Sequence, residues 1–286
     1  MAFGPEKVLF ELTYRCNLKC KHCYLEGMNS KEQPLEFWKN AICLFSEVGT
    51  KYAIISGGEP QLYSDFCEVM LLAKLKGMRT ILFTNGLLLN KNINNIKDCC
   101  VDKICVSIYG GTPATHDYVT GVPGSFLTLM ENISAIKNTG ILFELRMIVM
   151  NCNFSEINLA KNIAETHGAE FVLDSHLVPK IKTGQVLDEE QLSKSKKDIL
   201  VQSVEGSNAR YAPQNNECCS GGCRAASKLA IVSPCGEIYP CAKIRESIGV
   251  IKNGQIVINN KMNKIVKDKS IFPKICLAYA YKNLMK

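Results

Sequence analysis

Three cysteines near the start of the chain have the spacing that iron–sulfur chemistry requires. Cys16, Cys20 and Cys23 form a CxxxCxxC run. Such a loop can wrap three thiolates around one cubane cluster and leave the fourth iron without a protein ligand. Although the chain has 15 cysteines in 286 residues, a random arrangement of them would give this spacing only about 0.04 times. The motif therefore predicts a cluster with one iron open for chemistry.

Zinc is the competing metal for this loop, and inert thiols are the alternative without a metal. Structural zinc sites usually complete a tetrahedron with paired CxxC or Cys/His ligands. His22 could supply a fourth ligand only if the loop folded back on itself. The further motifs of the chain favour the cluster.

Composition and charge set the class of protein. Hydrophobic residues make up 47% and charged residues 21%, which is ordinary for a globular protein with a sizeable core. The segment before the first strand has no secretion-signal pattern, and the apolar runs are too short to span a bilayer. We therefore expect a cytoplasmic protein without membrane contact, in which the cysteines are metal ligands or buried small side chains rather than disulfides.

The net charge of +7 is concentrated at the end of the chain. Residues 261–286 hold seven Lys against one Asp, so the rest of the chain is close to neutral. This distribution argues against a nucleic-acid-binding face on the body of the protein. The basic tail is either a solvated helix or a contact for an acidic partner.

Short β-rich runs alternate with helix-length segments up to about residue 205, which predicts an α/β fold with six β/α units. Such an alternation forms a parallel sheet, and six units predict a partial (β/α)6 TIM-type barrel over residues 1–205. The expected strands are Val8–Thr13, Tyr52–Ser56, Thr80–Thr84, Ile104–Ile108, Phe143–Val149 and Glu170–Leu173.

Active sites of such barrels lie at the carboxyl ends of the strands. The cysteine loop follows the first expected strand, and Gly57-Gly58-Glu59-Pro60 follows the second. We therefore expect both motifs to line the same mouth.

The motifs together resemble the radical S-adenosylmethionine (SAM) superfamily. The resemblance rests on the CxxxCxxC loop and on three further motifs, each after or on its own strand, namely Gly57-Gly58-Glu59-Pro60, Thr84-Asn85-Gly86 and Ser107-Ile108-Tyr109-Gly110. It implies a [4Fe–4S] cluster held by Cys16, Cys20 and Cys23, whose free iron is chelated by the amine and carboxylate of SAM. One electron, from a donor such as flavodoxin or ferredoxin, then breaks a C–S bond, and the 5′-deoxyadenosyl radical abstracts a hydrogen from the substrate.

The resemblance also implies cofactor contacts. Gly57 and Gly58 let the backbone approach the methionyl amine because neither carries a Cβ. Glu59 is placed to accept a hydrogen bond from that amine. Asn85, in the motif after the third strand, joins this cofactor-binding set.

Three more cofactor contacts follow from the same resemblance. His22 takes the place where the family puts a flat side chain against adenine. Ser107 suits a ribose hydroxyl, and Arg146 suits the cofactor carboxylate through a bidentate salt bridge. The alternatives are a strand serine that only fills space and an arginine that is only a surface charge.

The glycine-rich stretch from Tyr109 to Phe126 resembles the peptide-modifying branch of the superfamily, where a loop of this kind closes beside the cofactor. Within it, His116 is a loop histidine and not an expected base. In the sulfatase-maturating relatives an Asp follows the equivalent of Cys241, whereas this chain has Ala242. Oxidation to formylglycine is therefore disfavoured.

Residues 206–286 resemble a SPASM or twitch extension, which holds auxiliary iron–sulfur clusters. The resemblance rests on Cys219-Ser220-Gly221-Gly222-Cys223 and on Gly236 followed by Cys241. A full SPASM domain has more cysteines, so the shorter twitch form with about one auxiliary cluster is expected; loose thiols are the alternative. The expected ligands are Cys219, Cys223, Cys241 and Cys276, with Cys218 and Cys235 as substitutes.

These features predict a radical SAM enzyme that acts on a peptide in the maturation of a ribosomal natural product. The reaction would be a thioether or carbon–carbon crosslink, or an epimerisation with Cys223 or Cys235 as hydrogen donor. The alternatives are a radical SAM enzyme for a tetrapyrrole or other cofactor precursor, and a non-enzymatic iron–sulfur electron carrier. Because the chain enters the first strand almost at once, recognition of a leader peptide is expected from the barrel rim, the basic tail or a separate leader-binding protein.

Overall fold

The computed structural model describes residues 4–204, 209–211 and 228–259, and the chain divides into two compact units. The first unit combines Met1–Arg15, Asn29–Ile81 and Pro213–Lys286. The second combines Cys16–Met28 and Leu82–Ala212. The boundary between the units falls inside strand β3. Each unit contains part of the sheet and the helices that pack on that part.

The sheet of the first unit has the strand order β11-β10-β9-β8-β1-β2. Strand β1 lies between β2 and β8 and is parallel to both, with Val8 opposite Ala53 and Ala230. Beyond β8, each neighbouring pair is antiparallel. The strands are β1 (Lys7–Glu11), β2 (Tyr52–Ser56), β8 (Leu229–Val232), β9 (Glu237–Tyr239), β10 (Gly249–Lys252) and β11 (Gln255–Ile258).

Helices α1 (Leu35–Glu47) and α2 (Phe66–Leu75) belong to the same unit, and a short 3-10 turn η1 (Pro60–Leu62) precedes α2. The apolar residues of α1 recur at helical spacing and form one buried face. Phe10 of β1 meets this face edge-on, with ring centroids 6.4 Å from Trp38 and 5.8 Å from Phe45. The buried residues of α1 are Trp38, Ala41, Ile42 and Phe45.

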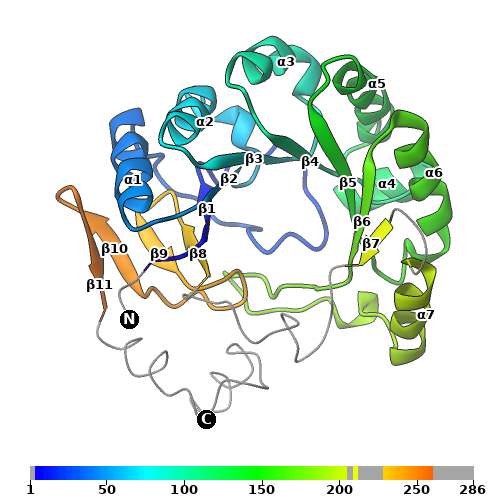
Figure 1. Cartoon of the computed structure of the whole chain (residues 1–286). Coiled ribbons are helices and arrows are strands. Elements are labelled where there is room, and N and C mark those ends of the chain that lie inside the picture. The colour runs from blue at the N-terminus through cyan, green and yellow to red at the C-terminus, as the bar shows by residue number, and fades with distance from the viewer. Residues whose placement is uncertain (1–3, 205–208, 212–227, 260–286) are drawn as a thin grey trace. The chain divides into compact units, whose positions relative to one another are not determined.

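In the second unit β4, β5, β6 and β7 are parallel neighbours, and helices α5 and α6 lie on one face of β4–β6 (Figure 1). The strands are β3 (Arg79–Thr84), shared with the first unit, β4 (Lys103–Ser107), β5 (Leu142–Ile148), β6 (Glu170–Asp174) and β7 (Ala209–Tyr211). The helices are α3 (Leu89–Asp98), α4 (Pro113–Thr120), α5 (Ser125–Lys137), α6 (Ile157–His167) and α7 (Lys194–Val204), with 3-10 turns η2 (Phe154–Glu156) and η3 (Asp188–Glu190).

The six predicted strands are confirmed as β1 to β6, and each is followed by a helix. The main difference is at β1, which ends at Glu11 rather than at Thr13. The carbonyl of Thr13 accepts from the backbone N–H of Gly58 at 2.8 Å. The backbone N–H of Leu12 also donates to the Ser56 carbonyl at 2.9 Å, so the chain stays beside the end of β2 after the regular ladder ends at Glu11. After residue 228 the chain forms two further strands, β8 and β9, joined by a turn.

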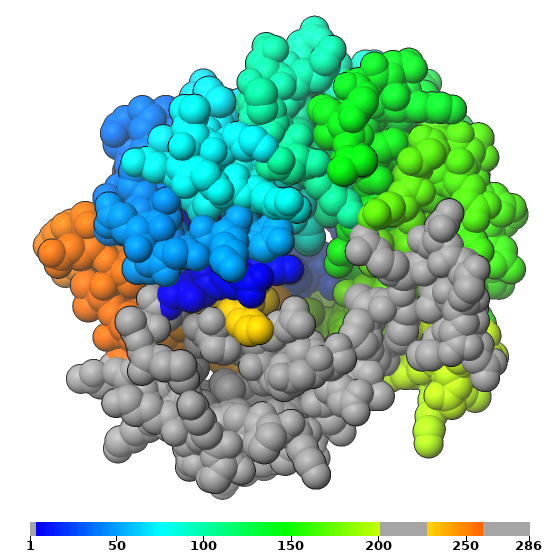
Figure 2. Space-filling view, viewed as in Figure 1, coloured from blue at the N-terminus to red at the C-terminus, as the bar shows by residue number. Residues whose placement is uncertain are grey.

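The described residues contain no helix that is both long enough and apolar enough to cross a membrane. The hairpin of β10 and β11 is exposed on the face shown in Figure 2, where it is orange. Its outer strand carries Val257, which is half exposed.

Candidate active site

The cysteine loop lies in the second unit, where it is held against the end of α4. The backbone N–H groups of Lys19 and Lys21 donate to the carbonyls of Thr120 and Val119, at 2.9 and 3.0 Å. Helix α4 ends there because Gly121 adopts a left-handed conformation with φ of +68°. A Cβ at Gly121 would lie 2.8 Å from the carbonyl oxygen of Lys19, so glycine permits this close approach.

The three thiols of the loop are neighbours. Cys16 is exposed, whereas Cys20 and Cys23 are half-buried. Burial raises the pKa of the Cys20 thiol, and the Cys23 and Cys16 thiols raise that pKa further. Burial also raises the pKa of Cys23. Three mutually repelling thiolates form readily only when cationic iron binds them, so the thiols are a suitable donor set for a cluster.

The described part of the chain holds no group of three His, Cys, Asp or Glu side chains arranged to bind a single metal ion. In a cubane cluster each thiolate binds a different iron, so the donors need not converge on one point. Three adjacent thiols on one loop fit the cubane arrangement.

The ring of His22 packs against Tyr109, which follows β4, with centroids 4.8 Å apart. Burial lowers the pKa of His22 to about 4, so the imidazole is neutral at pH 7. Its buried Nδ1 has no hydrogen-bond partner among the described residues. A flat, neutral ring with an unused ring nitrogen suits a bound heterocycle, and the assignment of His22 to adenine stays a prediction.

Tyr109 connects the cysteine loop to β4. Its ring packs with Val119 and Met150, and Cys20 packs against the same cluster. The Tyr109 hydroxyl lies within hydrogen-bonding reach of the Cys20 thiol and of Ser107. Because burial raises the pKa of Tyr109 far above its ordinary value, the hydroxyl stays protonated and can donate. The ribose contact assigned to Ser107 stays a prediction. In this structure the Ser107 side chain interacts with Tyr109.

The side chain of Asn85, after β3, points at the cysteine loop. Its Nδ2 donates to Asn17 Oδ1 at 2.7 Å and contacts Cys16 Sγ at 3.8 Å. Its Oδ1 accepts from the backbone N–H of Leu87 at 3.0 Å. The structure thus places Asn85 beside the first cysteine, while its predicted contact with the cofactor stays a prediction.

Arg146 on β5 is part of a buried charge network. Its Nε and Nη2 donate to Glu144 Oε1 at 3.1 and 2.8 Å. The second oxygen of Glu144 meets Lys103 Nζ at 2.6 Å. Burial alone would raise the pKa of Glu144, but the two cations outweigh it and lower that pKa to about 2. Arg146 is therefore more than a surface charge, and its predicted salt bridge to a cofactor carboxylate stays a prediction.

The Gly57-Gly58-Glu59 motif lies in the first unit, where it docks on the segment that follows β1. A Cβ at either glycine would lie 2.3 Å from a backbone oxygen, that of Thr13 for Gly57 and that of Arg15 for Gly58. Glu59 donates its backbone N–H to the Arg15 carbonyl at 2.8 Å. Both residues must therefore be glycine because of close backbone contacts within the protein. This reason could not be deduced from the sequence.

Glu59 itself is fully buried. Its Oε1 accepts from the backbone N–H of Gln61 at 3.2 Å, which starts the η1 turn. A buried carboxylate at this position is a strong acceptor for an ammonium group. Its predicted hydrogen bond from the methionyl amine stays a prediction.

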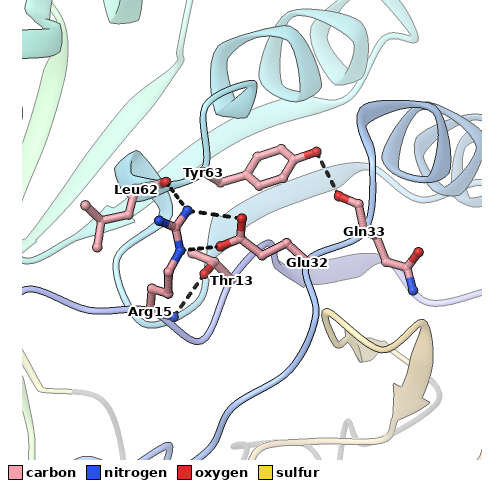
Figure 3. Close-up of polar contacts among 6 residues, drawn as sticks. All are labelled: Thr13, Arg15, Glu32, Gln33, Leu62 and Tyr63. Atoms are coloured by element: carbon pink, nitrogen blue, oxygen red, sulfur yellow. Dashed lines mark hydrogen bonds and ion pairs between the residues drawn. The ribbon is translucent and has the colours of Figure 1, made fainter.

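Arg15, the residue before Cys16, is fixed by a set of contacts that sequence reasoning missed (Figure 3). Its Nε and Nη2 donate to the two carboxylate oxygens of Glu32 at 2.6 and 3.0 Å. Nη2 also donates to the Leu62 carbonyl at 2.5 Å, and the backbone N–H of Arg15 donates to Thr13 Oγ1 at 2.9 Å. The chain is thereby anchored at the last residue before the cysteine loop.

The glycine-rich stretch after β4 is tied to η2 through Glu156. The Glu156 carboxylate accepts from the backbone N–H groups of Gly111 and Thr112 at 2.8 and 3.0 Å. His116 is buried, its Nδ1 accepts from the backbone N–H of Tyr109 at 3.2 Å, and burial lowers its pKa to about 4. His116 lies in helix α4 and not in a loop as expected, and its exclusion as a base stays a prediction.

Asp174 and His176, at the carboxyl end of β6, form a second pair that sequence reasoning missed. His176 Nδ1 lies 2.9 Å from Asp174 Oδ1. Although burial alone would raise the pKa of Asp174, the hydrogen bond with His176 lowers it. The available signal was an Asp-x-His sequence at the end of a barrel strand.

Of the C-terminal cysteines, only two lie in the described residues. Cys235 is exposed in the turn between β8 and β9, and Cys241 is half-buried in a bridge with Ile244. The other expected ligands or substitutes, Cys218, Cys219, Cys223 and Cys276, lie outside the described residues. The auxiliary ligand set therefore stays a prediction.

The arrangement of thiols, glycine motif and parallel strands is that of a known family. The model of the radical SAM superfamily matches residues 10–159, just over half of the chain. The chain belongs to the radical SAM superfamily. Membership implies a [4Fe–4S] cluster and SAM as its cofactors.

Among curated proteins, the chain is similar to the AdoMet-dependent heme synthase of Nitratidesulfovibrio vulgaris. The two are 25% identical over 282 aligned residues, which cover 86% of this chain and 76% of the synthase. It is also similar to the subtilosin biosynthesis protein AlbA of Bacillus subtilis, with 29% identity over 259 residues, 83% of this chain and 55% of AlbA. Relatives thus include proteins named for tetrapyrrole and for peptide chemistry.

Among solved structures, SuiB of Streptococcus suis, crystallised with its precursor peptide SuiA, matches with a TM-score of 0.70 and 14% identity. The match covers 86% of this chain and 62% of SuiB. The chain spans less than two thirds of the length of both AlbA and SuiB. The likeness confirms the fold class of a radical SAM partial barrel, with parallel β/α units and additional antiparallel strands.

Proposed function

We propose that this chain is a radical SAM enzyme that cleaves SAM reductively and abstracts a hydrogen atom from a peptide substrate. The observation that carries the proposal is the loop of three adjacent thiols, Cys16, Cys20 and Cys23, in a chain whose superfamily is established. When bound there, the cluster supplies the single electron that breaks the C–S bond of SAM.

We assign residues of each unit to hold the cofactor and to exclude water. We assign the methionyl amine to the buried carboxylate of Glu59, and adenine to the neutral ring of His22. Arg146, fixed by Glu144, presents positive charge to the cofactor carboxylate, and Ser107 and Asn85 complete the assigned set. Tyr109 fills the space behind Cys20 and His22 with a buried ring, which keeps water from that side of the loop.

A peptide is the substrate class that we favour, with a crosslink or an epimerisation as the reaction. The support is the similarity to AlbA, at 29% identity over 83% of this chain. The structural similarity to SuiB agrees with this choice, but at 14% identity it supports the fold only. The proposed partners are a precursor peptide and an electron donor of the flavodoxin or ferredoxin class. If the precursor has a leader peptide, a separate leader-binding protein is a third proposed partner.

A tetrapyrrole substrate is the second candidate. The specific observation in its favour is the heme synthase match, which extends over 76% of that protein, against 55% for AlbA. The two candidates differ in which compound the enzyme changes, the tetrapyrrole or the peptide, so the masses of both compounds after the reaction distinguish them.

We further propose that residues 206–286 form a twitch-like auxiliary domain that follows the 1–205 barrel in the chain, with one auxiliary iron–sulfur cluster. Cys241, half-buried after β9, is the ligand within the described residues, and Cys219, Cys223 and Cys276 complete the set. Such a cluster would take up the electron released when a crosslink forms. Cys235, exposed in the β8–β9 turn, is the described candidate for a hydrogen-donating thiol.

The test is anaerobic co-expression with each short peptide that the neighbouring genes encode, followed by mass spectrometry of the peptide. A loss of two hydrogens indicates a crosslink, and an unchanged mass with deuterium uptake from solvent indicates epimerisation. In parallel, the purified enzyme is incubated with iron-coproporphyrin III, SAM and dithionite. Turnover of the porphyrin with an unmodified peptide would overturn the peptide proposal and establish the second candidate.

A further inference from the structure

Two side chains outside the cysteine motif lie against the sulfur atoms of two of its cysteines. Asn85, which follows β3, places its Nδ2 3.8 Å from Cys16 Sγ. The backbone N–H of Leu18 donates to the same sulfur at 3.4 Å. Cys16 Sγ therefore receives one donor from its own loop and one from a neighbouring strand end.

Cys20 has a corresponding donor on another strand. Tyr109 follows β4, its ring is buried against Val119 and Met150, and Cys20 packs on this cluster. The Tyr109 hydroxyl contacts the Cys20 thiol and is itself oriented by Ser107. The ring of His22 fixes the phenol from another side. The hydroxyl is thus held in place rather than free to rotate away.

We propose that Asn85 and Tyr109 are positioning residues that raise the reduction potential of the [4Fe–4S] cluster by donating hydrogen bonds to the ligand sulfurs of Cys16 and Cys20. The proposal rests on the proposed function, because it requires a cluster on this loop. It gives Asn85 a role toward the cluster besides the cofactor contact proposed above.

The physical reason is the charge that reduction adds. Each electron makes the cluster and its thiolates more negative, and N–H and O–H dipoles aimed at the sulfurs stabilise the more negative state. A cluster with these donors is easier to reduce than one without them. The two donors thereby bring the cluster within reach of a protein electron donor of the flavodoxin or ferredoxin class.

The geometry of Asn85 fits this role. Both sides of its amide are engaged, since Nδ2 meets Asn17 and Cys16 and Oδ1 accepts from Leu87. The contact with the sulfur is compatible with all of these bonds, and the second lone pair of Oδ1 stays open to a further donor.

The test is a redox titration of the reconstituted full chain, monitored by electron paramagnetic resonance in the absence of SAM. Tyr109→Phe removes only the hydroxyl, and Tyr118→Phe is its matched control, because Tyr118 lies half exposed on α4. Asn85→Ala removes the amide at Cys16, and Asn17→Ala removes the other partner of that amide but leaves the sulfur contact. Pulsed measurements in deuterated solvent report the exchangeable protons near the cluster.

We expect Tyr109→Phe and Asn85→Ala each to shift the midpoint potential to more negative values, and the double variant to shift it further. Tyr118→Phe and Asn17→Ala should keep the wild-type potential, and Tyr109→Phe should lose an exchangeable-proton coupling. Wild-type potentials in both test variants, or an equal shift in Asn17→Ala, would overturn the assignment. A wild-type chain that takes up no cluster would instead overturn the proposed function and the assignment with it.

Discussion

Glu144 is a buried carboxylate that pairs with Arg146, one of the predicted cofactor residues, and its pKa is strongly lowered. The side chain is 3% exposed and lies between Lys103 and Arg146. A buried carboxylate is stable only when cations and hydrogen bonds compensate for the lost water. Glu144 therefore orients Arg146, the residue that we assign to the cofactor carboxylate.

Glu144→Gln is expected to lower the free energy of unfolding at neutral pH. Its two cationic partners depress the pKa of Glu144 from its ordinary value of 4.5 to about 2, so its charge stabilises the fold fully above about pH 4.5. This contribution, at most about 3 kcal/mol, is lost as the pH falls toward 2. Urea unfolding at pH 7, 5 and 3.5 measures it.

The control for this experiment is Glu131→Gln, because Glu131 is exposed on α5. It should match the wild type at every pH. The stability gap between wild type and Glu144→Gln should narrow as the pH falls. A gap that stays constant from pH 7 to 3.5 would show that the Glu144 charge does not account for it.

At the residue scale, the features of the site that depend on residue type and on spacing along the chain could be predicted from the sequence. The spacing of Cys16, Cys20 and Cys23 sufficed to predict neighbouring thiols. The partners of Arg15 and Asn85 were not predictable, because Glu32 is 17 residues from Arg15 and Cys16 is 69 from Asn85. Such contacts depend on side-chain direction in the folded chain, which periodicity does not provide.

At the scale of elements, Gly57 and Gly58 allow the segment after β2 to pack closely against the segment after β1. We call this backbone contact the joint. A Cβ at Gly58 would lie 2.3 Å from the Arg15 carbonyl oxygen, and that backbone cannot move without breaking the Glu59 to Arg15 hydrogen bond. Gly58→Ala should therefore displace the segment that leads into Cys16. We expect a loss of stability of about 2 kcal/mol or more together with reduced iron uptake.

Gly140→Ala is the matched control for Gly58→Ala. Gly140 has φ of +73°, and a methyl group added there would meet no atom within 4 Å, so the substitution has only a conformational cost of about 1 kcal/mol. It should lower the melting temperature but leave iron uptake unchanged. Full iron content in Gly58→Ala would show that the joint does not position the cysteine loop.

Helix α5 begins against Asp117, and this contact also steadies the end of α4 that holds the cysteine loop. The Asp117 carboxylate accepts from the backbone N–H groups of Gly124 and Phe126 at 2.6 and 2.8 Å, and from Ser125 Oγ at 2.8 Å. Asp117→Ala removes an acceptor from the amino end of a helix, which costs about 1–2 kcal/mol. Thermal unfolding checks this, and Asp98→Ala, at the end of α3, should change the melting temperature less.

Periodicity was sufficient to predict β1 to β6, since buried parallel strands such as Tyr52–Ser56 appear as short β-branched runs between helical segments. The end of β1 at Glu11 was not predictable, because the chain stays beside the end of β2 through Leu12 and Thr13 after the regular ladder ends. The parallel pairing of β8 with β1 was likewise not predictable, because it joins residues more than 200 positions apart.

At the scale of the whole molecule, the superfamily and the fold class are shown, and the reaction is our proposal. The fold class and the superfamily are established by the family match and by the likeness to SuiB. The substrate class is a choice between a peptide and a tetrapyrrole, for which AlbA and the heme synthase are the respective relatives. Both choices require the same first event, reductive cleavage of SAM at the cysteine loop.

The most direct test of this first event is formation of 5′-deoxyadenosine from SAM by the anaerobically reconstituted chain with dithionite, measured by liquid chromatography and mass spectrometry. The wild type and Cys43→Ala, which changes a cysteine of α1 outside the motif, should both form it. Cys16→Ala, Cys20→Ala and Cys23→Ala should each form at most about one hundredth as much, because the cluster loses a ligand. A reconstituted wild type that forms no 5′-deoxyadenosine, or a Cys20→Ala variant as active as Cys43→Ala, would contradict SAM cleavage at this loop.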